Sequence, residues 1–182
     1  HQNVIVIGVN YRLGALGFLC HPDISSGNMG IEDQMLALEW VYSNIEYFGG
    51  DRENITLMGQ SAGAISAYAL LANKSASKMV SNAILQSGRY DNFEELEVSH
   101  QKAERFADFA GVEVKALKTL PLDEILNVQT KFAKTQTEFA SSAIPFLPVI
   151  DQHTIRSEVH EDFLEGARGK NIILGSTRDE MH

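Results

Sequence analysis

Cysteine is almost absent from this chain, because Cys20 is the single one among 182 residues. A lone cysteine excludes a disulfide framework within these residues, and no neighbouring Cys or His spacing points to a redox or metal motif around it. We therefore expect the Cys20 thiol to lie in the protein core or in a loop.

Positive charge is also scarce. Lys and Arg number 15 against 24 Asp and Glu, which gives a formal net charge of −9, and the basic residues form no cluster. Because phosphate backbones are bound by clustered basic side chains, this composition argues against nucleic acid as a partner.

No long hydrophobic run and no signal peptide is visible in the sequence. None of the apolar stretches approaches the roughly 20 residues needed to span a bilayer. The chain begins at His1 and not at Met, and it enters an apolar segment at once, so we expect further residues to precede it. The cellular location and the oligomeric state therefore stay open.

What the chain does contain is ordinary for a globular protein, with 44% hydrophobic and 21% charged residues. Its length fits one domain or a piece of one. Short β-branched apolar segments alternate with longer amphipathic ones, which predicts an α/β protein with a mostly parallel sheet and helices on both faces. The expected strands are 3–9, 55–58, 82–86 and 171–175.

The segments between these strands are expected to be mostly helical. The expected helices are 31–45, 64–71, 93–111, 122 onward and 157–166. Trp40 lies on the first of them and is expected in the core or at its margin. Residues 10–30, rich in Gly, are predicted to form a long loop. We interpret 93–166 as a mostly helical insertion that covers the sheet, because no linker isolates it as a separate domain.

A serine motif, Gly59-Gln60-Ser61-Ala62-Gly63, joins the second expected strand to the helix that follows. A sharp strand-to-helix turn holds a serine hydroxyl clear of the backbone, and the two glycines leave room for that turn. The Ala62 N–H, at the positive end of the helix, is a natural donor to the oxyanion of an attacked ester. The pentapeptide alone leaves a nucleophile and a chance match equally open.

Two acidic residues, Asp179 and Glu180, follow the fourth expected strand as Ser61 follows the second. The carboxyl ends of parallel strands meet at one edge, where the reactive groups of open α/β sheets collect. A serine followed by an acid fits the Ser–Asp/Glu–His order of α/β-hydrolases. An acidic pair in a loop is also commonly just solvated, so this position alone assigns no role.

Several segments together resemble the type-B carboxylesterases, the cholinesterase-like branch of the α/β-hydrolases. They are 10–14, 17–18, 27–30, 33–34, 37–41, 44–45, 48–51, 59–63, 86–88 and 175–180. The likeness is dense over residues 1–90, thin across the helical block, and returns near 145–149 and at the end. It implies that residues 1–182 form a partial α/β-hydrolase catalytic domain, the central part of the sheet, incomplete at both ends.

The resemblance implies a serine carboxylic-ester hydrolase that works through an acyl-enzyme. In it, Ser61 is the nucleophile, Glu180 is the acid that orients the catalytic histidine, and the Ala62 N–H is one oxyanion donor. Its substrate would be a small-molecule ester, and the resemblance implies no metal and no organic cofactor.

Four further residues receive supporting roles from the same resemblance. Arg12 and Asp33 would form a structural ion pair between the loop and the helix that follows it. Ser87 and Gln60 would lie next to the catalytic residues and help to hold them in place. For Ser87, a hydroxyl at the end of a strand with no role in the site is an equally good interpretation. The family usually has Glu where Gln60 stands, and the neutral amide favours a neutral ester over a cationic, choline-like one.

Two parts of the family's machinery are expected outside this chain. The His-Gly-Gly oxyanion loop should precede residue 1, and the catalytic histidine should follow residue 182. None of the six histidines present matches a family motif, and His182 is too close to Glu180 in sequence to reach between it and Ser61. The strand implied just before residue 1 belongs between the first and second expected strands. We therefore expect these 182 residues alone to be poorly folded and hydrolytically inactive.

Two other functions remain open from the sequence. One is a non-catalytic, cholinesterase-like binding or adhesion domain, since this fold also serves interaction roles. Such relatives typically lose the serine, so the presence of both Ser61 and Glu180 favours an enzyme. The other is a lipase of the same fold, which only lid and pocket residues would separate from an esterase.

Overall fold

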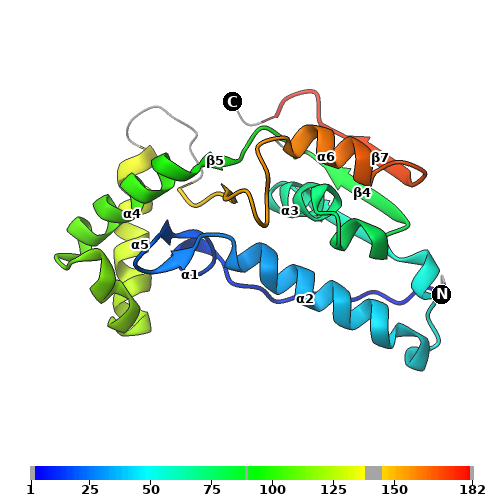
Figure 1. The fold of residues 1–182 in the computed structure, drawn as a ribbon, viewed down its shortest axis with the longest axis horizontal. Helices are drawn as coiled ribbons and strands as arrows, with labels where there is room; N and C mark the ends of the chain where they lie inside the picture. Colours follow the sequence, from blue (N-terminus) through cyan, green and yellow to red (C-terminus); the bar gives the residue numbers. More distant parts are fainter. Residues whose placement is uncertain (1–2, 89, 138–144, 181–182) are drawn as a thin grey trace.

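The computed structural model describes residues 3–88, 90–137 and 145–180 of the chain. Its main sheet is parallel, with three strands in the order β3-β4-β7 (Figure 1). These strands are β3 (Thr56–Gln60), β4 (Asn82–Gln86) and β7 (Asn171–Gly175). The predicted α/β class with a parallel sheet is confirmed, and two of the predicted strands have the observed bounds.

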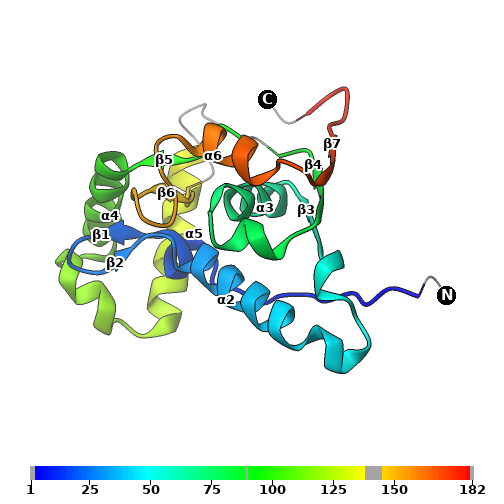
Figure 2. The same ribbon diagram turned by 45° about the vertical axis from the view of Figure 1, so that its right-hand side comes forward.

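Away from this sheet, two long helices and two small strand pairs form the other end of the molecule (Figures 1 and 2). The elements are α1 (Gly14–Phe18), β1 (Cys20–His21), β2 (Ser25–Ser26), β5 (Glu94–Glu95), α4 (Leu96–Ala110), η4 (Val114–Thr119), α5 (Leu122–Thr137) and β6 (Val149–Ile150). β1 pairs antiparallel with β2, and β5 pairs parallel with β6. The rings of Phe106, Phe132 and Phe146 pack together with centroids 5.5 to 6.2 Å apart. These aromatic contacts give this end its core.

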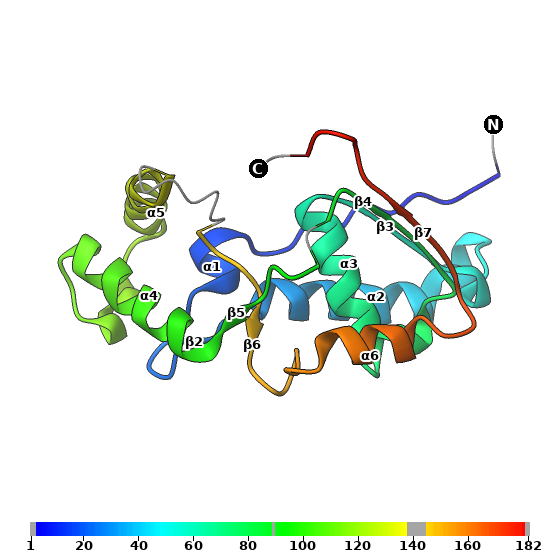
Figure 3. The same cartoon turned by 90° about the horizontal axis from the view of Figure 1, so that it is seen from above.

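Three helices lie on one side of the main sheet, as Figure 3 shows from above. They are α2 (Met29–Asn44), α3 (Ala62–Ala72) and α6 (Val159–Gly166). α3 packs directly on β3 and β4, and α6 packs on α3. On the opposite face the side chains of Met58 and Ile173 are 69% and 62% exposed. The helices of the described residues thus cover one face, whereas the sequence led us to expect a helical layer on each face.

α2 shows the helical spacing that the sequence predicts, but its outer face is more apolar than expected. Ile31 and Leu38 are buried, whereas Trp40 is 53% exposed and packs against the ring of Phe48 at 6.0 Å. The prediction that Trp40 lies in the core or at its margin is therefore wrong in the described part of the chain. Three short 3-10 helices also occur in the chain: η1 (Ile45–Phe48), η2 (Arg52–Asn54) and η3 (Ala76–Met79).

No helix among the described residues is long and apolar enough to cross a membrane.

The segment 3–9, predicted as a buried central strand, forms no strand in the structure. Its side chains are exposed, with Val4 at 72% and Val6 at 88%. A strand needs a neighbour to pair its backbone groups, and the described residues place none beside this segment. The composition of 3–9 suits a strand, so the prediction failed because pairing depends on a partner that the segment itself does not specify.

Residues 10–30 hold more regular structure than the long loop that was predicted. α1 and the β1–β2 hairpin both lie within this range. Cys20 is 2% exposed, and its thiol donates a hydrogen bond to the Ser26 carbonyl oxygen at 3.2 Å. Burial raises the pKa of the Cys20 thiol to about 11, so the thiol stays neutral at physiological pH.

Gly166 is the last residue of α6 and packs tightly against the backbone of α3. A Cβ atom on Gly166 would lie 1.9 Å from the Leu71 carbonyl oxygen. We therefore expect Gly166→Ala to lower the free energy of unfolding by about 2 kcal/mol, because the two helices would have to separate. Denaturant unfolding of the whole protein measures this loss. Glu165→Ala, on the exposed side of the same helix, should stay within about 0.5 kcal/mol of the parent, and an equal loss in both variants would contradict the explanation.

Candidate active site

Ser61 stands alone between β3 and α3, in a backbone conformation that side chains rarely adopt. Its φ is 54° and its ψ is −119°. The turn is fixed from both sides, because the Ser61 N–H donates to the Gln86 carbonyl at 2.9 Å and the Ser61 carbonyl accepts from Ala64 N–H at 2.9 Å. Strain of this kind persists only where the surrounding structure holds it, and it clusters at functional sites. The exposed Ser61 side chain makes no capping hydrogen bond to α3.

The glycine before Ser61 is required by close packing. A Cβ atom on Gly59 would lie 2.2 Å from the carbonyl oxygen of Gly63. A Cβ atom on Gly63 would meet nothing within 4 Å among the described residues. The expectation that both glycines make room for the turn is therefore supported at Gly59 alone.

Ala62 is the first residue of α3 and borders a cavity of about 210 Å³. The first N–H groups of a helix have no partner within it, so the Ala62 N–H is among those left for an acceptor outside the helix. The cavity is lined almost entirely by apolar groups. Its lining is Tyr11, Leu13, Gly14, Phe18, Ala62, Ile65, Ser66, Pro145, Phe146, Leu147 and Pro148.

The structure brings Ser87 and the chain after β7 to the same edge of the sheet as Ser61. The Cα atoms of Gln60, Gln86 and Gly175 are paired across the three strands, so each strand ends at one level. Ser87 follows β4 with φ 50°, and its N–H donates to the Gly175 carbonyl at 2.7 Å. Gln60 itself is exposed at the end of β3.

The two acidic residues after β7 differ in their surroundings. Glu180 is half-buried, and its Oε1 accepts the Thr177 N–H at 2.7 Å. The Asp179 carboxylate is exposed and pairs with its neighbour Arg178 at 3.0 Å. Of the two, Glu180 is the carboxylate that the local backbone holds in a defined position.

Arg12 and Asp33 form an ion pair that fastens the segment before α1 to α2. The guanidinium donates to both carboxylate oxygens, at 2.6 and 2.8 Å, and the Arg12 N–H donates to Asp33 Oδ2 at 3.0 Å. These hydrogen bonds lower the pKa of Asp33 and raise that of Arg12. A carboxylate with three donors stays charged well below neutral pH.

We expect Asp33→Asn to lower the free energy of unfolding at pH 7 by about 1 kcal/mol, a small value because Arg12 is half-exposed and solvent screens the pair. The pair contributes fully above the unfolded-state pKa of Asp, about 4, and the contribution is lost as pH falls through the lower folded-state pKa. Urea unfolding of parent and variant at pH 7 and near pH 3 therefore measures a difference in unfolding free energy that becomes smaller at the lower pH. Asp108→Asn, on the exposed side of α4, is the control, and an Asp33→Asn difference that is equal at both pH values would contradict the assignment.

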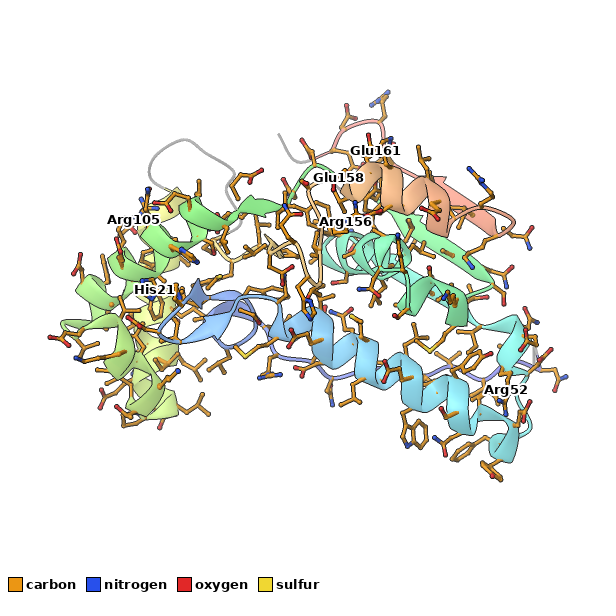
Figure 4. The ribbon with its side chains drawn as sticks, in the orientation of Figure 1. His21, Arg52, Arg105, Arg156, Glu158 and Glu161 are labelled. Carbon is orange, nitrogen blue, oxygen red and sulfur yellow. The ribbon has the colours of Figure 1, made fainter. Side chains whose placement is uncertain are left out.

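The described histidines have partners away from Ser61 and Glu180. His21 contacts the carboxylates of Asp23 and Glu104 and packs against His100 near α4, at the end of the molecule far from β7 (Figure 4). The other contacts are His160 Nδ1 with the Tyr68 hydroxyl at 2.7 Å, and the His153 N–H with Asp151 at 2.9 Å. His1 and His182 lie outside the described residues. Within the part of the chain that the structure describes, no group of three His, Cys, Asp or Glu could hold a metal ion.

Residues 145–148 form one wall of this cavity, a role that their sequence does not predict. These residues lie more than eighty positions after Ala62 along the chain, yet both border the cavity. Their Pro-Phe-Leu-Pro sequence predicts an extended, apolar segment and nothing more. Only the folded structure supplies the neighbour that gives the segment a role.

Comparison with known proteins finds both similar sequences and similar folds. A model of the carboxylesterase family matches residues 1–182. A probable N-octanoylanthranilate hydrolase of Rhodococcus erythropolis is 41% identical over 98% of this chain and 40% of its own length. The para-nitrobenzyl esterase of Bacillus subtilis (strain 168) is 35% identical over 97% of this chain and 37% of its own length.

The solved structures agree with the sequence matches. The structure of a thermophilic para-nitrobenzyl esterase superposes with a TM-score of 0.81 at 32% identity, over 94% of this chain and 36% of that one. The chain therefore spans about 40% or less of the length of these relatives. The sequence similarity and the structural similarity both extend over nearly all residues of this chain.

Proposed function

This chain belongs to the carboxylesterase family, and on that premise we propose that the whole protein hydrolyses carboxylic esters through an acyl-enzyme on Ser61. The observation that carries the proposal is the positive φ of Ser61 at the junction of β3 and α3. A serine held in such a turn is the arrangement that nucleophilic acyl transfer requires.

In the proposed mechanism, Ser61 Oγ attacks the acyl carbonyl carbon while a histidine removes the hydroxyl proton. The carbonyl oxygen becomes an oxyanion, which the Ala62 N–H stabilises together with donors from elsewhere in the enzyme. The histidine then protonates the leaving alcohol, and water releases the acyl group by the same steps in reverse. Glu180 orients the histidine, which we assign to a part of the enzyme beyond these residues.

We assign a neutral ester with an apolar group to this site. The cavity beside Ala62 offers apolar walls, and Gln60 places no negative charge next to Ser61 that would attract a cationic substrate. The R. erythropolis relative is named for an octanoyl substrate, and a chain of that kind suits walls of this chemistry.

A panel of esters tests the proposed function on the whole protein. We expect turnover of p-nitrophenyl esters, little turnover of choline esters, and loss of activity after treatment with a fluorophosphonate. Absence of turnover on every carboxylic ester, with the fluorophosphonate unreacted, would instead indicate the non-catalytic binding domain that this fold also permits.

A further inference from the structure

Asn28 is fully buried between β2 and α2, and its side chain pairs with the backbone of one distant residue. Asn28 Nδ2 donates to the Val149 carbonyl at 2.7 Å, and Asn28 Oδ1 accepts the Val149 N–H at 2.8 Å. Two such bonds to one residue reproduce what an opposite residue on a neighbouring antiparallel strand would provide. The other edge of β6 is held by β5, where the Glu94 N–H donates to the Pro148 carbonyl at 2.9 Å. Val149 is therefore fixed from both edges.

Val149 directly follows the segment that forms one wall of the cavity. Residues 145–148 form that wall, and Ala62, Ile65 and Ser66 of α3 contribute another part of the lining. The two prolines of the segment fix their own φ angles, so the position of Val149 limits where the wall can lie.

Asn28 is also connected to the α3 wall. Its carbonyl accepts the Ile31 and Glu32 N–H groups at 2.9 Å each, which starts α2. One turn further along α2, Gln34 Nε2 donates to Ser66 Oγ at 3.3 Å. Asn28 thus holds Val149, the residue next to segment 145–148, through its side chain, and it is linked to α3 through the first turns of α2.

The turn just beyond β6 strengthens this anchor. Asp151 Oδ1 accepts the N–H groups of His153, Thr154 and Ile155 at 2.9, 2.7 and 3.0 Å. Burial acts to raise the pKa of Asp151, but hydrogen bonds from these N–H groups and from Asn28 lower it overall. The carboxylate therefore stays charged, and the turn holds the chain after the wall in place.

We propose that Asn28 is a positioning residue that sets the spacing of the two cavity walls and so fits the apolar group of the ester beside Ser61. This inference rests on the proposed esterase function. Without the two bonds to Val149, segment 145–148 could shift relative to Ala62, and small misplacements of this kind weaken productive binding. Esters with a long apolar group touch both walls, so they should lose more than acetate esters of small alcohols.

The test compares Asn28→Ala with the parent in the whole enzyme, with rates expressed per active site after fluorophosphonate titration. Two series vary the acyl group (p-nitrophenyl acetate and hexanoate) and the alcohol (ethyl and hexyl acetate). In each series we compare kcat/KM for the long ester with kcat/KM for the short one. We expect this ratio to be about tenfold lower in Asn28→Ala than in the parent in one of the two series, mainly because KM for the long ester rises. Asn44→Ala is the matched control, because within the described residues the Asn44 side chain donates only to the Trp40 carbonyl of its own helix, and it should leave both ratios unchanged.

Hydrogen–deuterium exchange of a peptide containing residues 145–150 gives the second readout. We expect faster exchange there in Asn28→Ala, with α3 unchanged. If the long-to-short ratios of kcat/KM are the same in Asn28→Ala and in the parent, the proposal is overturned, whether or not exchange accelerates. A residue that only stabilises the fold would change the fraction of enzyme that is active, but not these ratios. If the alanine variant yields no soluble enzyme, Asn28→Ser is judged by the same outcomes. If the parent hydrolyses no ester, the proposed function fails, and unchanged exchange at 145–150 would separately refute the clamp.

Discussion

Replacing Ser61 by alanine in the whole enzyme is expected to lower kcat for p-nitrophenyl acetate by about 10⁴- to 10⁶-fold, with KM nearly unchanged. The reason is that the acyl-enzyme route disappears, whereas the cavity and the oxyanion donor at Ala62 remain. Initial rates at saturating ester, measured on protein of verified fold, give the comparison.

Ser43→Ala serves as the control for this loss. Ser43 is exposed near the end of α2, so its removal changes serine content without touching the turn after β3. We expect it to retain the parent rate. A Ser61→Ala enzyme with more than about a tenth of the parent kcat would contradict the assignment of the nucleophile.

Glu180→Gln is expected to lower kcat by about 10³- to 10⁴-fold, because a neutral amide cannot stabilise the imidazolium and permits the wrong histidine tautomer. Stability should change little, since the amide oxygen can still accept the Thr177 N–H that Glu180 Oε1 accepts. The pair of measurements is kcat on p-nitrophenyl acetate and the thermal unfolding midpoint.

Asp179→Asn separates the two neighbouring acids. Asp179 is exposed and pairs only with Arg178 among the contacts observed for its side chain, so we expect kcat within a few-fold of the parent. A large loss of kcat in Asp179→Asn together with an active Glu180→Gln would show that Asp179, not Glu180, orients the histidine. Equally small losses in both variants would show that neither residue does.

Much of the sheet and the turn at Ser61 could be predicted because local sequence determines them. The runs at 82–86 and 171–175 are apolar and end at polar or glycine residues, and the structure gives both as strands with those bounds. The turn at Ser61 needs a glycine at 59, where a side chain would collide with Gly63. In each case the requirement lies within a few residues of the feature.

The failed predictions concern features that depend on distant partners. Segment 3–9 has the composition of a buried strand, yet it pairs with no strand among the described residues and stays exposed. Trp40 was expected in the core or at its margin because of its place on an amphipathic helix, and the described chain leaves half of its surface uncovered. Composition states what a segment can bury, whereas burial itself requires a surface contributed by another part of the fold.

The cavity illustrates the same limit for the candidate site. The nucleophile motif could be found by its spacing, but the hydrogen bonds between Asn28 and Val149 join residues 121 positions apart. Nothing in the sequence near Asn28 specifies that partner. The contact arises only when α2, β6 and the hairpin of β1 and β2 are assembled.

The most direct measurement identifies the serine that carries a covalent adduct after a fluorophosphonate reacts with the whole enzyme. Trypsin releases residues 53–74 as one peptide, which contains Ser61 and also Ser66, so fragment spectra must distinguish these two sites. We predict a single adduct on Ser61. An adduct on Ser66, on Ser87 or outside the 53–74 peptide, with Ser61 unmodified, would contradict the account.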